Sequence, residues 1–173
     1  AFDRILDPIE GAFAPIAAAA PPPGKVTGGP NPAGYLIGHH QNDASAVVNE
    51  LLAAGADVAW PGDRTLGSHP GRGAIYVAGG RRTADILERM AASRGVSAIG
   101  IATPPGGPAL RLRPVRIGLW GRYGGAARSG WVRWILERYA FRFELVYPQT
   151  LDAGGIGERF DVLARIRRLV QQC

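Results

Sequence analysis

The stretch between Val115 and Val162 constrains the fold most, because strand-like and helix-like patterns alternate in it at short intervals. An apolar run, VRIGLW (115–120), is followed by a glycine-rich turn, an amphipathic pattern and a second apolar run, FRFELVY (141–147). GERFDVLA (157–164) begins a further strand pattern. Such alternation favours an open parallel sheet, in which ligands bind beyond the carboxyl ends of the strands.

Two similar strand–helix–strand patterns precede this stretch, at about 33–60 and 73–101. Asp43 and Thr83 are suitable N-cap residues for their helices, and a glycine follows each helix pattern as a stop. We therefore predict an α/β protein with an open, mainly parallel sheet and helices on both faces. The three units fit one sheet, or two smaller sheets divided near Pro104–Pro108.

The helix pattern of the third unit is expected to begin near Ser129 and to end at about Tyr139. One of its faces carries apolar side chains, from Trp131, Trp134, Ile135 and Tyr139. A helix that has one apolar face normally packs that face against the protein core. We expect this face to pack against the strands.

Composition and punctuation divide the chain into three parts. Residues 1–32 are rich in proline and glycine, and we expect a linker and the tail of a preceding element there. Residues 33–109 hold the first two α/β units, and residues 110–173 hold the third. The sequence has no apolar run long enough to cross a membrane, so we expect no membrane span.

The chain is basic, with a formal net charge of +6, and 19 of its 20 basic residues are arginine. A basic surplus is typical of nucleic-acid-binding proteins. Here, however, the arginines are scattered among acidic residues, apart from one cluster at Arg165, Arg167 and Arg168. We therefore expect no nucleic-acid partner.

The sequence offers little support for a catalytic or metal site. A zinc site needs three or four ligands in suitable geometry, whereas His39, His40 and His69 belong to no recognised ligand motif. Cys173 is the single cysteine, and no G-x-S-x-G nucleophile motif occurs. We assign no catalytic residue, no metal ligand and no cofactor to this chain.

The turn GRYGGAARSG (121–130) is the best candidate for a binding site, because it joins a strand to the start of a helix. Backbone N–H groups and the helix dipole favour an anion there. The glycine spacing is not that of a dinucleotide fold or a P-loop, so a flexible turn with solvated arginines is the alternative. The candidate anion-binding residues are Gly121, Arg122, Gly124, Gly125, Arg128, Ser129 and Gly130.

Several of these segments also resemble a known family. RIGLW (116–120), SGWVRWILERYAF (129–141), FELVY (143–147) and ERFDVL (158–163), with the upstream run from PPPGKVTGG (21–29), resemble the C-terminal region of large bacterial zinc carboxypeptidases of the carboxypeptidase A/T-like family. The most specific part of the resemblance is a helical cluster, Gly130, Trp131, Arg133, Trp134 and Glu137, and the pair Phe160–Asp161 supports it.

The resemblance implies that the chain is a non-catalytic accessory region. It also implies that residues 110–173 are the start of a flavodoxin-like domain similar to class I glutamine amidotransferases. It implies that zinc and the catalytic residues lie in an upstream metallopeptidase domain, which would be the partner of this region and would hydrolyse C-terminal peptide bonds. It also implies a secreted or periplasmic location. The chain departs from the family at Arg128 and Ser129, where acidic residues are usual. The alternative is a stand-alone flavodoxin-like module that binds an anionic small molecule.

Overall fold

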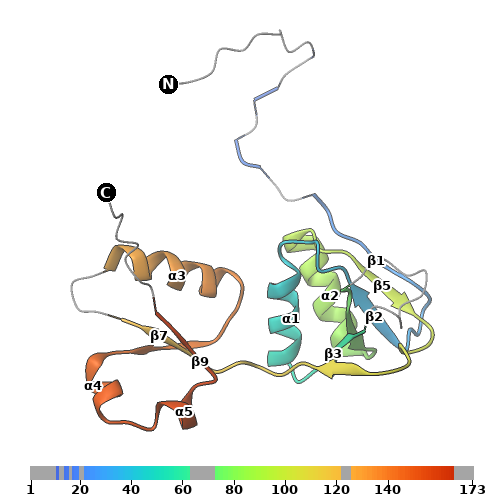
Figure 1. Ribbon diagram of the computed structural model, residues 1–173. Helices are drawn as coiled ribbons and strands as arrows, with labels where there is room; N and C mark the ends of the chain where they lie inside the picture. The colour runs from blue at the N-terminus through green and yellow to red at the C-terminus, as the bar shows by residue number, and fades with distance from the viewer. Residues whose placement is uncertain are drawn as a thin grey trace, which may run out of the picture.

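The computed structural model describes residues 11, 14–15, 17–19, 22–62, 73–121 and 126–165, which form two α/β units (Figure 1). The first unit contains β1 (Val26–Thr27), β2 (Gly34–Ile37), α1 (Ala44–Ala53), β3 (Val58–Pro61), β4 (Ile75–Ala78), α2 (Arg81–Arg94), β5 (Ala98–Ile101) and β6 (Ala109–Arg111). The second contains β7 (Ile117–Trp120), α3 (Ala126–Arg138), β8 (Phe143–Val146), α4 (Pro148–Asp152), α5 (Ile156–Arg159) and β9 (Val162–Ala164).

The first unit is built on a sheet with the strand order β1-β5-β2-β4-β3-β6. Only β1 and β5 pair in parallel, whereas β2 pairs antiparallel with β4 and β5, and β3 pairs antiparallel with β4 and β6. The prediction of a mainly parallel sheet is therefore wrong for this unit. From β2 to β5, the order of elements and strands is that of a ferredoxin-like, split βαβ fold.

The split arrangement explains why the local patterns were misleading. The helix α1 does connect two strands that run the same way, β2 and β3, but β4 lies between them in the sheet. In the same way, α2 connects β4 to β5 across β2. Both strand–helix–strand patterns are present in the structure. However, the two strands of one pattern do not pair with each other, and every pair that they form with a strand of the other pattern is antiparallel.

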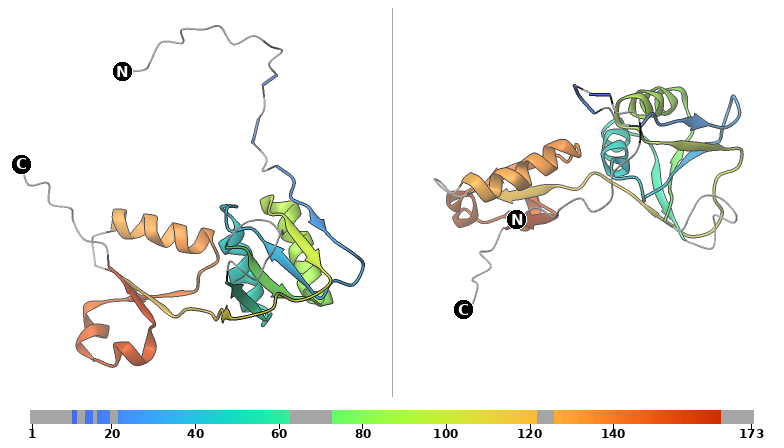
Figure 2. Two further views of the ribbon diagram at one scale, coloured as in Figure 1. Left: turned by 45° about the vertical axis from the view of Figure 1, so that its right-hand side comes forward. Right: turned by 90° about the horizontal axis from the view of Figure 1, so that it is seen from above.

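Both helices of the first unit lie on one face of its sheet, so the predicted helices on both faces are not found there (Figures 1 and 2). The core between them is formed by fully buried side chains from the sheet and α1, including Ile37, Val47, Leu51, Val58 and Val77. On the opposite face a smaller cluster contains Leu36, Ala74 and Ile101, with Tyr76 packed beside it.

The ends of α1 and α2 follow the sequence closely. Gly55 has a φ of 79° and Gly95 a φ of 68°, the left-handed conformation in which glycine commonly ends a helix, so both predicted stops are confirmed. Asp43 precedes α1 as predicted, but its side chain makes no capping hydrogen bond. Thr83 is not a cap, because α2 begins at Arg81 and buries Thr83 inside its first turn.

The second unit has a parallel sheet with the strand order β8-β7-β9. The helix α3 joins β7 to β8 on one side of this sheet, and α4 with α5 join β8 to β9 on the other side (Figure 1). This unit has the parallel pairing and two covered faces that the sequence predicts. When its strands are numbered along the chain, the order β8-β7-β9 is 2-1-3, which is the order of the first three strands of one common doubly wound sheet.

Of the two arrangements that the sequence left open, two separate sheets are found. The short strand β6 still pairs with β3, so the chain leaves the first sheet only after Arg111. It enters the second sheet at Ile117. The strand β1 lies within residues 1–32, where we expected a linker, and adds an edge to the first sheet.

Three of the four side chains that we expected to pack inward point outward, whereas Tyr139, directly after α3, packs inward as expected. The exposed fractions of Trp131, Trp134 and Ile135 are 70%, 55% and 46%. Helix α3 begins at Ala126 rather than near Ser129. The less exposed residues in the described part of α3 are Val132 and Leu136, and Tyr139 in the turn after it continues their spacing, which is that of one helical face.

The two units meet at the carboxyl end of α3. The Asn49 side-chain amide of α1 donates a hydrogen bond to the Tyr139 carbonyl oxygen at 2.9 Å, and Arg94 donates to the Arg138 carbonyl at 3.1 Å. The Tyr139 ring packs against the core of the first unit. The last carbonyl groups of a helix have no N–H partner within the helix. Asn49 and Arg94 therefore provide hydrogen-bond donors to carbonyl groups at this end of α3. Within the described residues, no helix is long and apolar enough to span a bilayer.

Candidate functional site

Gly121 lies directly after β7, the central strand of the parallel sheet, and therefore at the carboxyl edge where ligands bind in such folds. It is buried, and its N–H donates a hydrogen bond to the Val146 carbonyl oxygen at 2.9 Å. A Cβ atom at this position would lie 3.0 Å from the Tyr147 ring. A larger residue at this position would therefore crowd the Tyr147 ring.

The structure describes only part of the predicted anion site. Arg122, Gly124 and Gly125 lie outside the described residues. Arg128 and Ser129 lie in α3, and the structure describes their backbone but not their side chains. Gly130 is an exposed residue within α3 rather than part of the turn.

Three strand ends meet at this edge of the second sheet. Gly121 follows β7, Tyr147 follows β8, and the exposed Arg165 follows β9. In a sheet of this order the binding crevice is expected between β7 and β9, where the direction of winding changes. In the sequence, Arg165 is distinguished only as a member of a basic cluster. Its position directly after the third strand pattern was the signal that could have placed it at this edge.

The described groups at this edge can attract an anion, but they do not enclose one. Arg165 supplies a charge, and the start of α3 supplies the positive end of a helix dipole. The N–H of Gly121, by contrast, is already used in the bond to Val146. Electrostatic attraction of a small anion is therefore the chemistry that this edge supports.

A network of ion pairs holds the opposite, amino edge of the same sheet. The Asp161 carboxylate accepts hydrogen bonds from the two terminal guanidinium nitrogens of Arg113, at 3.1 and 3.2 Å. It also accepts from the Arg116 backbone N–H at 2.9 Å and from its guanidinium at 3.0 and 3.3 Å. These hydrogen bonds, first those from the Arg116 side chain and then those from Arg113, hold the pKa of Asp161 far below its usual value.

The Asp161 network is structural. A strongly shifted pKa often marks a functional group, but here every interaction that lowers the pKa of Asp161 is an ion pair or hydrogen bond within the chain. Arg116 precedes β7, and Asp161 precedes β9, so the network fixes these two strands side by side. The preceding residue, Phe160, is 8% exposed and packs against Gly118 of β7. The Phe160–Asp161 pair, which supports the family resemblance, thus stabilises the sheet.

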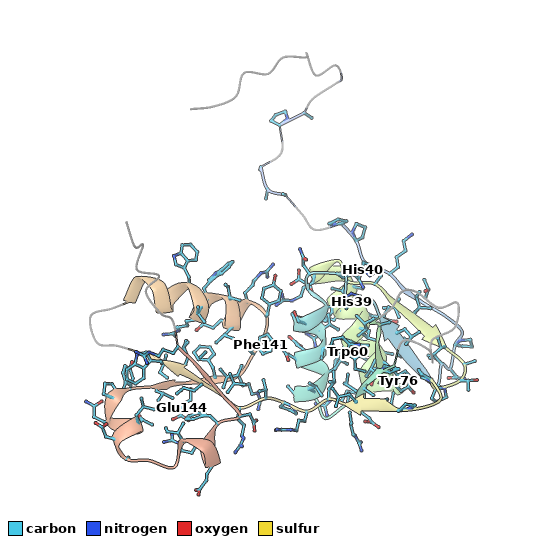
Figure 3. All side chains as sticks on the ribbon, in the orientation of Figure 1. His39, His40, Trp60, Tyr76, Phe141 and Glu144 are labelled. Carbon is cyan, nitrogen blue, oxygen red and sulfur yellow. The ribbon has the colours of Figure 1, made fainter. Side chains whose placement is uncertain are left out.

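No group of three potential metal-ligating side chains is found among the residues that the structure describes. His39 and His40 follow β2, with ring centroids 6.4 Å apart and ring planes nearly perpendicular (Figure 3). His39 lies close to Gly73, where a Cβ atom would come within 2.8 Å of its Nδ1 atom. His69 lies outside the described residues.

Comparison of this chain with protein-family models, curated proteins and solved structures found no match. The resemblance to zinc carboxypeptidases is therefore a hypothesis from the sequence motifs alone.

Proposed function

We propose that this chain is a non-catalytic accessory region of a zinc carboxypeptidase-like protein, with a flavodoxin-like, amidotransferase-related second unit. One observation supports this proposal most: the most specific cluster of the resemblance lies on the surface of α3, where Trp131 and Trp134 are 70% and 55% exposed. Large contiguous apolar surfaces commonly mark contacts with other proteins or domains. The motif is thus suited to packing against a neighbouring domain.

The two indole rings form the centre of this surface. Their centroids are 6.2 Å apart, and the ring planes meet at 83°, an edge-to-face arrangement. A Trp side chain buries about 150–250 Å² when fully covered, so covering the exposed part of each ring would contribute roughly 2–4 kcal/mol. An upstream peptidase domain is the proposed partner of this surface.

In this proposal the chemistry belongs to the partner. A peptidase domain would hold zinc, and zinc-activated water would hydrolyse the C-terminal peptide bond. The present chain would stabilise that domain or shape access to it.

The test begins with the coding sequence around this segment, in which we expect a metallopeptidase domain. Zinc content, thermal stability and carboxypeptidase activity are then compared between the full-length protein and a variant with Trp131→Ser and Trp134→Ser. We expect unchanged zinc content and a lower melting temperature. Stoichiometric zinc binding by residues 1–173 alone, or a coding sequence without a peptidase domain, would reject the proposal.

A second candidate function is a stand-alone module that binds an anionic small molecule, and the placement of Gly121 and Arg165 at one sheet edge favours it. Thermal-shift measurements with inorganic phosphate test this candidate. Stabilisation that disappears in Arg165→Gln, but persists in Arg82→Gln on α2, would support it. Equal shifts in both variants would exclude Arg165 from the site.

A further inference from the structure

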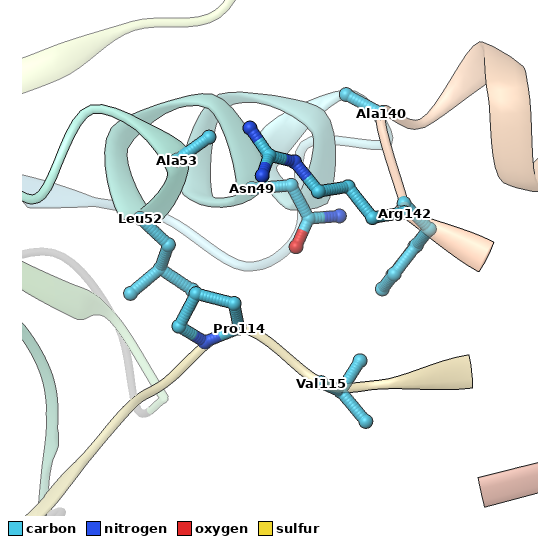
Figure 4. A pocket seen from close by; sticks show the side chains of 8 residues that line it. Asn49, Leu52, Ala53, Pro114, Val115, Ala140 and Arg142 are labelled. Carbon is cyan, nitrogen blue, oxygen red and sulfur yellow. The ribbon is translucent and has the colours of Figure 1, made fainter. Parts of the chain in front are cut away.

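A pocket of about 130 Å³ lies where the two units meet (Figure 4). One wall comes from α1, another from the segment that connects the two sheets, and a third from the turn between α3 and β8. Figure 3 shows Phe141, in that turn, beside α1. The lining residues are Asn49, Leu52, Ala53, Pro114, Val115, Ala140, Phe141 and Arg142.

The lining of this pocket is mainly apolar. Leu52, Pro114, Val115 and Phe141 provide its larger aliphatic and aromatic surfaces. An apolar cavity of about 150 Å³ in another protein is sufficient to bind benzene. The pocket therefore has room for one aromatic ring or a branched alkyl group of similar size.

Two polar side chains border the apolar lining. The Asn49 amide is fixed by its hydrogen bond to the Tyr139 carbonyl oxygen. The Arg142 side chain extends from the turn toward α1, so that its guanidinium lies at the rim of the pocket (Figure 4). Arg94 and Arg116 are held by Asp43 and Asp161, respectively, whereas Arg142 has no ion-pair partner among the described residues. A cation without a partner at an apolar pocket favours a ligand that has an anionic end.

We propose that this pocket binds a small carboxylate with one apolar group about as large as a benzene ring. The carboxylate pairs with the Arg142 guanidinium, and the apolar group contacts Leu52, Pro114 and Phe141. Pockets between structural units are frequent ligand sites. Because the ligand would contact both units, its binding would also stabilise their junction. The proposal is independent of the accessory role, since it requires no peptidase domain.

Binding to the 173-residue chain can be followed by NMR titration with benzoate. We expect a saturable change centred on Asn49, Phe141 and Arg142, with a Kd of the order of 1 mM, as is usual for so small a ligand. Benzamide has the same shape without the charge, and acetate has the charge without the ring. Both should bind at least about tenfold more weakly, because a charge-assisted hydrogen bond or the ring contact is lost.

Two variants locate the binding. Arg142→Gln should weaken benzoate binding about tenfold while leaving benzamide binding unchanged. The matched control Arg82→Gln, an exposed arginine on α2, should change neither. Val115→Phe should fill the pocket and abolish the response to benzoate. Unchanged amide spectra of the free variants establish that they are folded.

The outcomes separate clearly. Equal benzoate affinity of the unmodified chain and Arg142→Gln, equal responses to acetate and benzoate, or spectral changes confined to the Gly121 edge would each overturn the proposal. Failure of the peptidase test would leave it standing, since the readout here is ligand binding to this chain.

Discussion

Arg94 and Asp43 form an ion pair at 2.8 Å that connects the end of α2 to the start of α1. Their side chains are only 19% and 22% exposed, which makes this pair less accessible than the other described ion pairs of the first unit. The same guanidinium nitrogen also donates to the Arg138 carbonyl oxygen at the end of α3. One side chain therefore ties together three helices and both units.

Replacing Arg94 with methionine should lower the free energy of unfolding by about 1.5–3 kcal/mol, because hydrogen bonds to a charged, mostly buried partner are lost. Urea unfolding measures this change. Arg89→Met is the matched control, since Arg89 pairs with Glu50 but is 58% exposed. We expect the control to lose less than about 1 kcal/mol. Equal losses in the two variants would contradict a special role for Arg94.

Gly34 leaves room for the Tyr76 ring on the neighbouring strand. A Cβ atom on Gly34 would lie 2.2 Å from Tyr76 Cε2, and the Tyr76 hydroxyl donates to the Ala33 carbonyl oxygen at 3.1 Å. Gly34→Ala should therefore destabilise the chain by about 1–3 kcal/mol through overcrowding. In a Tyr76→Leu background the same substitution should cost less, which a double-mutant cycle would detect. Gly29→Ala is the control, because a Cβ atom added there would have no atom within 4 Å beyond those of the adjacent residues.

The Asp161 network predicts a specific dependence of stability on acid. Since Arg116 and Arg113 lower the folded-state pKa of Asp161 from its ordinary value of 3.8, folding favours the ionised carboxylate. The resulting stabilisation is fully present above about pH 4 to 5 and is lost as the pH falls through the lowered pKa. Unfolding measured between pH 2 and 6 should show this loss, and Asp161→Asn should flatten that part of the curve. An equally steep curve in Asp161→Asn would reject the assignment.

The local structure could be predicted better than its assembly. Helix stops at Gly55 and Gly95 follow from the conformational freedom of glycine, which acts within a few residues. The order of the first sheet depends instead on which distant strands pair, and a strand–helix–strand pattern does not reveal that β4 inserts between β2 and β3. The strand β6 lacked a signal because all its residues are exposed and carry no alternation.

The candidate site could be predicted in part for the same reason. The sequence predicted correctly that Gly121 follows a strand. An apolar run that ends in glycine is a pattern of adjacent residues, so it can be recognised without knowledge of the tertiary fold. Arg165 became relevant only when parallel pairing brought the ends of β7 and β9 to one edge. Likewise, the junction pocket combines residues from α1 with residues such as Pro114 and Arg142, which only tertiary packing brings together.

The orientation of α3 gives the last prediction. Hydrophobicity alone favours its Trp residues as the buried face, yet Leu136 is less exposed than Trp131. In the isolated chain, Leu136→Ala should therefore cost about 2 kcal/mol through lost packing, whereas Trp131→Ala should cost less than about 1 kcal/mol despite the larger side chain. Chemical denaturation of the two variants measures both values. A greater loss in Trp131→Ala would mean that the indole face packs inward in the isolated chain, and would remove the exposed surface on which the proposed contact with a peptidase domain depends.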